Sequence, residues 1–186
     1  MDTVRAFFAV EIGASAASAV ARVVEQLRGR KGGGNVRFVR QESLHVTLRF
    51  LGDVPVADLG GLVAAVGKEL AGVAPFDLSL GEPMAFPDPR RARVLALALA
   101  PAEPLIRAAV AVERGAVAAG LAPEERPFRP HLTLGRVKGG PPPVLEGIAT
   151  PAHEAFSADG VVLLQSELHL DGARYTPLER VPFGGR

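Results

Sequence analysis

The chain has 186 residues, of which 48% are hydrophobic and 22% charged, and its 21 basic and 20 acidic side chains give a formal net charge of +1. A chain of this length can bury a core without disulfides or a structural metal, which predicts one soluble domain. The absence of cysteine excludes thiolate catalysis and Cys-ligated metal clusters, and the near-zero charge argues against a protein that coats long nucleic acids. Since no apolar run reaches the length of a membrane span, we expect a protein that does not enter a membrane. A reducing cytoplasm is the default location for a chain without cysteine, and a monomer is expected.

Hydrophobic periodicity predicts alternating stretches of strand and helix in the first half of the chain. The predicted elements are a strand over 5–10, a helix over 16–27 that ends at three glycines, strands over 36–39 and 44–51, and a helix over 59–70. Strands over 76–80 and 94–99 follow, in that order. The second helix is predicted in spite of the glycines within it, because its apolar stripe is continuous.

The second half continues with a helix and then with strands separated by turn-rich segments. The predicted elements are a helix over 105–116 with Gly120 at its end, a turn-rich stretch over 123–130, a strand over 131–137, an irregular loop over 139–143, and a closing strand pair over 161–170 and 175–183. Helices and strands are mixed but do not alternate strictly. This pattern favours an α+β protein with largely antiparallel sheets.

One short pattern occurs twice, as Leu44-His45-Val46-Thr47-Leu48 and as Pro130-His131-Leu132-Thr133-Leu134, with nearly half the chain between the copies. Such spacing indicates an internal duplication. Residues two apart on a strand share a face, so each copy presents an imidazole beside a hydroxyl while the leucines and valine point into the core. If the two strands lie together, two imidazoles and two hydroxyls converge on a volume that suits a phosphate.

Two histidines can form an acid–base pair near neutral pH, because one imidazole accepts a proton while the other donates one. In attack on a phosphodiester, the neutral imidazole activates the incoming hydroxyl or water and the imidazolium protonates the departing oxygen. The hydroxyls of Thr47 and Thr133 can bond the non-bridging oxygens as charge develops there. This chemistry predicts no metal and no cofactor.

Other interpretations of the repeat remain open at this point. A duplicated structural device would show the same pattern without catalysis. Zinc binding by His45 and His131 is a weaker alternative, because no third ligand stands at a recognisable spacing. His153 and His169 lie outside the repeat and are interpreted as structural or surface residues.

Several segments together resemble the bacterial and archaeal RNA 2′,3′-cyclic phosphodiesterases, formerly called 2′-5′ RNA ligases, of the two-histidine phosphoesterase superfamily. The segments are Arg5-Ala6-Phe7-Phe8-Ala9-Val10, the first motif from Leu44 to Gly52, the second motif from Pro127 to Arg136, Ser166-Glu167-Leu168, and Gly172-Ala173-Arg174-Tyr175-Thr176. The resemblance covers nearly the whole chain. It implies a single domain over 1–186 with two pseudo-symmetric lobes, a central cleft and one His-x-Thr motif from each half.

The resemblance also implies an activity, namely metal-independent and ATP-independent opening of a terminal 2′,3′-cyclic phosphate to a 2′-phosphate, with 2′-5′ RNA ligation as the reverse reaction. It implies His45 as general acid and His131 as general base, Arg136 on the phosphate and Phe50 against a nucleobase. Strict strand alternation places both Arg136 and Phe50 on the wrong face, although a bulge at Gly135 could re-aim Arg136.

Basic residues gather around the motifs and are candidates for guiding an RNA end. They comprise the cluster over 22–49, the cluster of Arg90, Arg91 and Arg93, and the cluster of Arg126, Arg129, Arg136 and Lys138. Arg49 shares strand parity with His45 and Thr47, so it is predicted to face the same groove and to bind substrate.

Three functional hypotheses follow from these residues. The first is an enzyme that acts on RNA ends or on small cyclic or 2′-5′-linked nucleotides. The second is a phosphodiesterase for a small nucleotide, because the chain has a single tyrosine and no tryptophan with which to stack long RNA. The third is a binding module for RNA or nucleotides without catalysis.

Overall fold

The computed structural model describes residues 2–151, 154–169 and 172–184. Its three α-helices are α1 (Ala14–Arg28), α2 (Leu59–Leu70) and α3 (Ala102–Ala118). Its strands are β1 (Thr3–Glu11), β2 (Val36–Phe38), β3 (His45–Pro55), β4 (Phe76–Phe86), β5 (Val94–Ala100), β6 (His131–Val137), β7 (Ala155–Ala158), β8 (Gly160–His169) and β9 (Gly172–Pro182). All predicted helices and strands are therefore present, with shifted ends.

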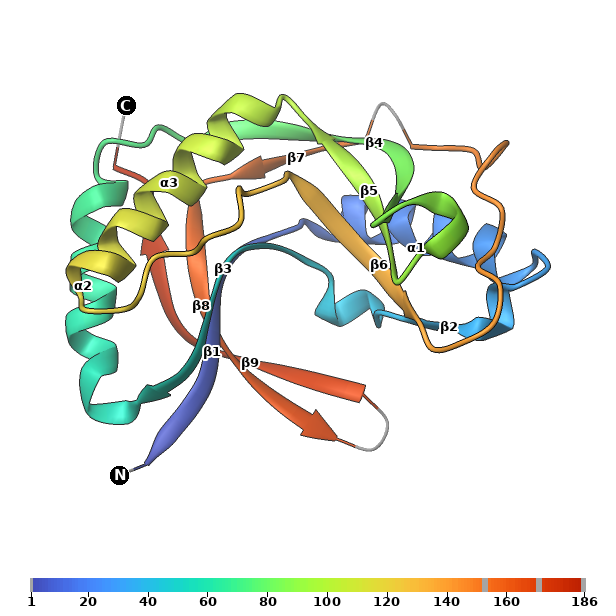
Figure 1. The fold of residues 1–186 in the computed structure, drawn as a ribbon. Coiled ribbons are helices and arrows are strands. Elements are labelled where there is room, and N and C mark those ends of the chain that lie inside the picture. Colours follow the sequence, from blue (N-terminus) through green and yellow to red (C-terminus); the bar gives the residue numbers. More distant parts are fainter. Residues whose placement is uncertain (1, 152–153, 170–171, 185–186) are drawn as a thin grey trace.

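The strands form two sheets (Figure 1). The first sheet has the order β3-β1-β8-β9 and the second has the order β2-β6-β5-β4-β7, and all the paired strands described are antiparallel. This arrangement confirms the predicted α+β class. Each sheet combines strands from the beginning and the end of the chain, so the sheets do not coincide with the two halves of the sequence.

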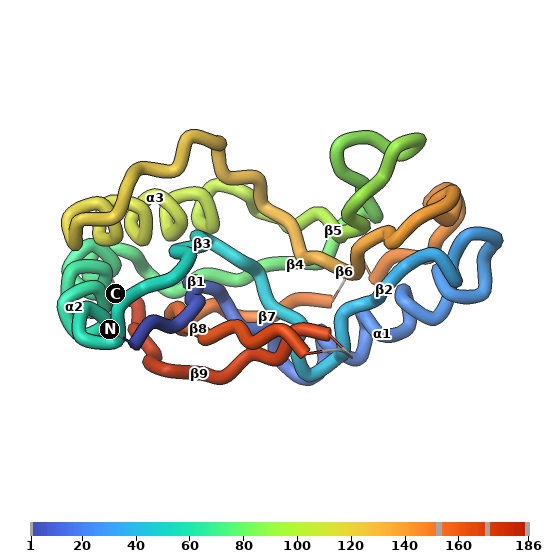
Figure 2. The backbone as a smooth tube through the Cα atoms, turned by 60° about the horizontal axis from the view of Figure 1, so that its bottom comes forward, coloured from blue at the N-terminus to red at the C-terminus, as the bar shows by residue number. Residues whose placement is uncertain are grey.

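Helices cover the two ends of the molecule. The pair α2 and α3 pack on each other, α2 against β9 and α3 against β3 of the first sheet. Figure 2 shows α1 at the other end of the molecule, beside β2. Each helix buries one apolar stripe, as its helical spacing predicts, for example Val20, Val23 and Leu27 on α1.

The first sheet has apolar residues on both faces. Ala6, Phe8 and Val10 of β1 belong to the main core, which extends beneath both sheets. The alternate residues Phe7 and Ala9 join Val162, Leu164 and Tyr175 in a smaller cluster on the opposite face. The side chains that β3 presents on that face, His45 and Phe50, contact Phe7 of this smaller cluster.

Two segments differ from the sequence predictions because their pattern is weak. β4 continues to Phe86, although Gly81, Glu82 and Pro83 interrupt its apolar pattern, and its pairing with β5 shifts register between Leu80 and Pro83. The short strand β7 is missed because four residues carry little periodic signal.

The first helix ends at Arg28, before the three glycines that were predicted to end it.

We predict that Gly115→Ala lowers the free energy of unfolding by about 1 to 3 kcal/mol through overpacking. Gly115 is buried where α3 crosses α2, and a Cβ at this position would lie 2.5 Å from the Cα of Val66. Urea denaturation of the purified variant measures this change.

The matched control is Gly61→Ala on the exposed face of α2, where nothing lies within 4 Å of the added Cβ. Because alanine is the better helix former, this variant is expected to be more stable than wild type by about 0.5 to 1 kcal/mol. Equal effects of the two substitutions would contradict the close helix approach.

Candidate active site

The two His-x-Thr motifs lie on strands that approach each other from different sheets. β3 is an edge strand of the first sheet, β6 is an interior strand of the second, and some of their Cα atoms lie within 8 Å of each other. Both strands show the same burial pattern from the histidine onward, with histidine and threonine half-buried and the next residue of each buried. The strands of the two motifs therefore lie close to each other.

The backbone fixes both imidazoles in the same way. His45 donates from Nδ1 to the carbonyl oxygen of Ser43 over 2.8 Å, and His131 donates from Nδ1 to the carbonyl oxygen of Arg129 over 2.7 Å. Because a carbonyl only accepts, Nδ1 carries the proton in both rings and Nε2 is left for chemistry. In His45 this Nε2 lies 3.0 Å from the hydroxyl oxygen of Thr47.

His45 is held in an aromatic environment. Its ring centre lies 4.9 Å from that of Phe7 and 5.0 Å from that of Tyr175, which meets it edge to face at 86°. Burial lowers the pKa of His45 below its ordinary value of 6.5, and the hydrogen bond with Ser43 opposes that change. The aromatic environment therefore favours the neutral form of His45 in the free protein.

His131 has its own aromatic neighbour in the second sheet. The ring centre of Phe86 on β4 lies 5.0 Å from that of His131, with the planes inclined at 60°. Phe86, Phe7 and Tyr175 were not singled out by the sequence, because strands distant in the sequence bring them to the histidines. Only the C-terminal resemblance around Tyr175 offered a signal.

Each motif strand contains a β-bulge directly after its threonine. On β3 the partners change from Ala9 with Thr47 to Phe8 with Arg49, so Leu48 is the extra residue. On β6 the partners change from Ala96 with Thr133 to Leu95 with Gly135, so Leu134 is the extra residue. An extra residue reverses the alternation of faces beyond it.

The bulges bring the fifth residue after each histidine onto the face of the motif. Phe50 is 59% exposed, and its ring centre lies 5.6 Å from Phe7, the residue that also contacts His45. Arg136 is likewise exposed. Burial raises the pKa of Tyr175, and the positive charge of Arg136 partly offsets that change. The bulge at Gly135 is confirmed, and the expectation that alternation turns Phe50 away from His45 is wrong.

Gly135 is required by the neighbouring strand β2. A Cβ at this position would lie 2.8 Å from the carbonyl oxygen of Arg37 and from the side chain of Val36. Any larger residue would push β2 away from the bulge that presents Arg136.

Arg49 and Thr47 line one cavity, but the Arg49 guanidinium is held by protein groups, so its role in substrate binding stays a prediction. The same bulge that exposes Phe50 turns Arg49 toward α3, where its side chain is 8% exposed. Its Nε lies 2.7 Å from Glu113 Oε2, its Nη1 lies 3.1 Å from Glu124 Oε2, and its Nη2 donates to the carbonyl oxygen of Ala122. The guanidinium is thus occupied by protein groups.

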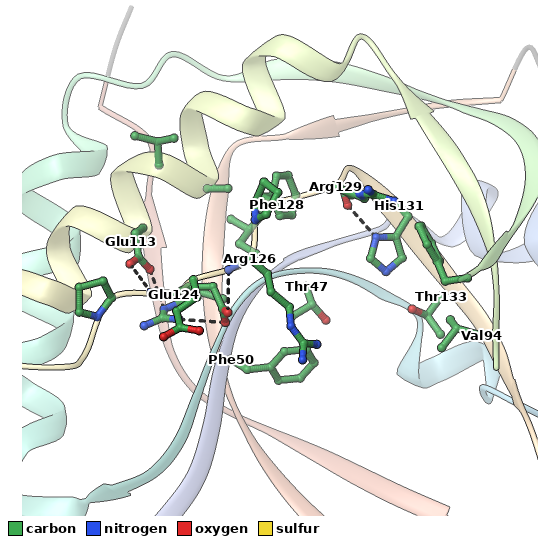
Figure 3. A pocket seen from close by; sticks show the side chains of 18 of the residues that line it. Thr47, Phe50, Val94, Glu113, Glu124, Arg126, Phe128, Arg129, His131 and Thr133 are labelled. Carbon is green, nitrogen blue, oxygen red and sulfur yellow. Dashed lines mark hydrogen bonds and ion pairs between the residues drawn. The ribbon is translucent and has the colours of Figure 1, made fainter. Parts of the chain in front are cut away.

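A cavity of about 930 Å³ lies between the motif strands and α3 (Figure 3). Thr47, Phe50, His131, Thr133 and Arg136 line it, so the structure brings these predicted residues together. The loop over 123–129 adds Arg126, Phe128 and Arg129, and Figure 3 shows the side chain of Arg126 reaching toward Phe50. His45 stands beside this cavity through its contact with Thr47.

Three arginines of the basic cluster over 22–49 make contacts within the protein. Arg30 donates to the carbonyl oxygens of Glu146 and Gly147, Arg28 lies over the ring of Phe38, and Arg49 pairs with Glu113. Guidance of an RNA end by this cluster stays a prediction. From the third cluster, Arg126, Arg129 and Arg136 line the cavity.

Further sequence expectations concern the remaining histidines, metals and membranes. His169 is exposed at the end of β8, as predicted, whereas His153 lies outside the described residues. Within the described ranges, no three His, Asp or Glu side chains gather as metal ligands would. None of the helices in this part of the chain is long and apolar enough to cross a membrane.

Two antiparallel sheets that bring a pair of His-x-Thr strands to one cavity define a class of α+β phosphoesterases with paired histidines. A family model described as the 2′-5′ RNA ligase superfamily matches residues 16–170, and the chain belongs to this family.

Proteins of known name and structure are similar over nearly the whole chain. A protein of Methanothermobacter thermautotrophicus named RNA 2′,3′-cyclic phosphodiesterase is 33% identical over 94% of this chain and 92% of its own. One of the same name from Thermus thermophilus is 32% identical over 97% and 91%. A crystal structure of a Thermus thermophilus protein matches with a TM-score of 0.80 and 30% identity over 97% of this chain and 98% of its own. E. coli LigT, solved in complex with 3′-AMP, matches with a TM-score of 0.76 and 26% identity over 98% and 99%.

We predict that Tyr175→Ala raises the pKa of His45 toward 6.5, because solvent then reaches the imidazole and favours its charged form. An NMR titration of the imidazole resonances measures this pKa directly. Phe50→Ala is the matched control, because Phe50 is also an aromatic residue of the site but its ring contact is with Phe7, whereas the ring of Tyr175 contacts His45. An unchanged His45 pKa in Tyr175→Ala would show that Tyr175 does not shield the ring.

Proposed function

We propose that the protein hydrolyses the 2′,3′-cyclic phosphate at an RNA end to a 2′-phosphate, with His45 and His131 as an acid–base pair, and that 2′-5′ ligation is the reverse of this reaction. One observation carries the proposal, namely two imidazoles fixed in the same tautomer on facing strands, each beside a threonine of the same cavity. The names of the similar proteins support the substrate class. In this proposal residues 1–186 act as one bilobal domain, with one motif from each half of the sequence.

The proposed reaction moves one proton at each histidine. His131 Nε2 accepts a proton from water as its oxygen attacks phosphorus, and the bond from phosphorus to the 3′ oxygen breaks. His45 Nε2 donates a proton to that departing oxygen. The products are a 2′-phosphate monoester and a 3′-hydroxyl, and in ligation the two histidines exchange roles.

His45 must gain a proton before it can act as the acid. Its pKa is lowered by burial in the free protein, and the negative charge of a bound phosphodiester would raise it. The Thr47 oxygen, 3.0 Å from Nε2, can accept from the protonated ring until the departing oxygen takes its place. Substrate binding and protonation of His45 are therefore coupled.

The remaining cavity residues are assigned to substrate binding. Arg136 and Thr133 are suited to the non-bridging phosphate oxygens, since the guanidinium is a permanent charge and the hydroxyl a donor. Phe50, exposed and supported by Phe7, offers a platform for a nucleobase.

The size and lining of the cavity favour an RNA end over a small cyclic nucleotide. A volume of about 930 Å³ is at the upper end of the range for sites that enclose a drug-sized ligand. Arg129 adds positive charge beside His131, and Arg126 adds it nearer to Phe50, where a further nucleotide would place its phosphate. E. coli LigT was solved in complex with a mononucleotide, 3′-AMP.

We predict that His45→Ala and His131→Ala each lower turnover of an RNA oligonucleotide with a 2′,3′-cyclic phosphate end by about 10² to 10⁴. The assay contains EDTA, and chromatography against standards identifies the 2′-phosphate. His169→Ala, at an exposed histidine on the β8–β9 hairpin, is the matched control and is expected to retain full activity.

Two results would count against the proposal. Wild type that binds the oligonucleotide without turning it over would point to a binding module. A 3′-phosphate product would show that the bond to the 2′ oxygen breaks, which contradicts the reaction given above.

We predict that kcat/KM rises with pH where the general base loses its proton and falls where the general acid loses its own, because the reaction needs a neutral His131 and a protonated His45. Each limb is expected to approach a tenfold change for each pH unit. In kcat the falling limb is expected at higher pH than in kcat/KM, since the negative charge of bound substrate raises the pKa of the acid. Initial rates from about pH 5 to pH 9 test this, and a kcat/KM with no falling limb in that range would contradict a mechanism that needs a protonated imidazole.

A further inference from the structure

Arg49 is the one charged or polar side chain that is buried in the described part of the chain. Three groups from outside β3 surround its guanidinium: the carboxylate of Glu113 on α3, and the carboxylate of Glu124 and the carbonyl of Ala122 in the segment after α3. A buried charge persists only where partners satisfy it, so these contacts are a defined feature of the fold.

The same carboxylates also hold the segment that leads to the second motif. Glu113 Oε1 accepts from the backbone N–H of Glu124 over 2.8 Å, and Glu124 Oε1 accepts from the backbone N–H of Arg126 over 3.2 Å. Figure 3 shows Glu113 and Glu124 close together at one side of the cavity, with dashed lines at both carboxylates. The segment then continues through Phe128 to His131, the first residue of β6.

We propose that Arg49, Glu113 and Glu124, called the Arg49 cluster, set the position of His131 relative to His45. Arg49 stands two residues after Thr47 on the strand of the first motif, whereas Glu124 belongs to the segment that delivers the second. β3 and β6 belong to different sheets, so no ladder of backbone hydrogen bonds fixes the distance between them. The inference rests on the proposed function, because it concerns the two residues assigned to proton transfer.

The geometry requires arginine at this position. The guanidinium donates from Nη1 to Glu124 and from Nη2 to the Ala122 carbonyl, and its Nε lies 2.7 Å from Glu113 Oε2 as an ion pair without hydrogen-bond alignment. A lysine ammonium is a point charge on a flexible stem and cannot hold this planar arrangement. The members of the Arg49 cluster are positioning residues, since their charged groups contact one another and the proposed chemistry occurs at the histidines.

Glu124→Gln is the most informative variant. The Glu124 side chain is 42% exposed, so its change is compatible with folding, whereas loss of Arg49 leaves Glu113 without its charged partner. One oxygen of a glutamine cannot serve both Arg49 and the Arg126 N–H as two carboxylate oxygens do. Glu124→Asp keeps the charge and is the conservative variant.

We expect Glu124→Gln to lower kcat on the cyclic-phosphate oligonucleotide by roughly ten- to a hundredfold, because a displacement of about 1 Å at a reacting group has effects of that size. Glu124→Asp is expected to recover part of the loss. Glu103→Gln is the matched control, since Glu103 pairs with Arg107 on the exposed face of α3. In NMR spectra of the imidazole nitrogens, His131 is expected to shift in Glu124→Gln and His169 is not.

The outcomes separate this inference from the proposed function. Wild type without turnover defeats the proposed function itself. Active wild type with equal kcat in Glu124→Gln, or with unchanged His131 resonances, overturns the positioning role. A loss of activity that matches the fraction of unfolded protein, measured by thermal melting, also overturns it, because a purely structural cluster would behave in that way.

Discussion

The site depends on one extra residue in each motif strand. Without the bulges at Leu48 and Leu134, the fifth residue after each histidine would lie on the core face, and neither Phe50 nor Arg136 would reach the cavity. The bulges also determine the surroundings of the residue just before Phe50 and of the residue just before Arg136. Arg49 is buried in a cluster of ion pairs, and Gly135 packs closely against β2.

The two halves of the site share a plan but have different surroundings. The carbonyl that orients each imidazole belongs to the residue two positions earlier, so the orientation is a property of each motif itself. The aromatic neighbours differ, because His45 is covered by Phe7 and Tyr175 and His131 is flanked by Phe86. Equal geometry in unequal environments is the physical condition for one imidazole to donate while the other accepts.

The sequence predicted the fold class, most elements and a cavity shared by Thr47, His131 and Thr133, because these depend on local periodicity and on a repeated motif. It could not place Arg49, since strand parity assumes a regular strand and the bulge at Leu48 has no signal such as glycine. Phe7, Phe86 and Tyr175 reach the histidines through pairings between distant strands. The partners of Arg49 were missed for the same reason.

Arg49 and Gly135 occupy the same place in the two motifs, four residues after the histidine, but neither residue could replace the other. β3 is an edge strand, so the side chain after its bulge has room beside α3, whereas β6 has β2 along its flank and tolerates only glycine there. A chimera that carried the first motif in both strands would force an arginine into β2. A chimera with the second motif in both strands would fit sterically, but it would lose the Arg49 guanidinium that pairs with Glu113 and Glu124. Each motif therefore fits only its own strand.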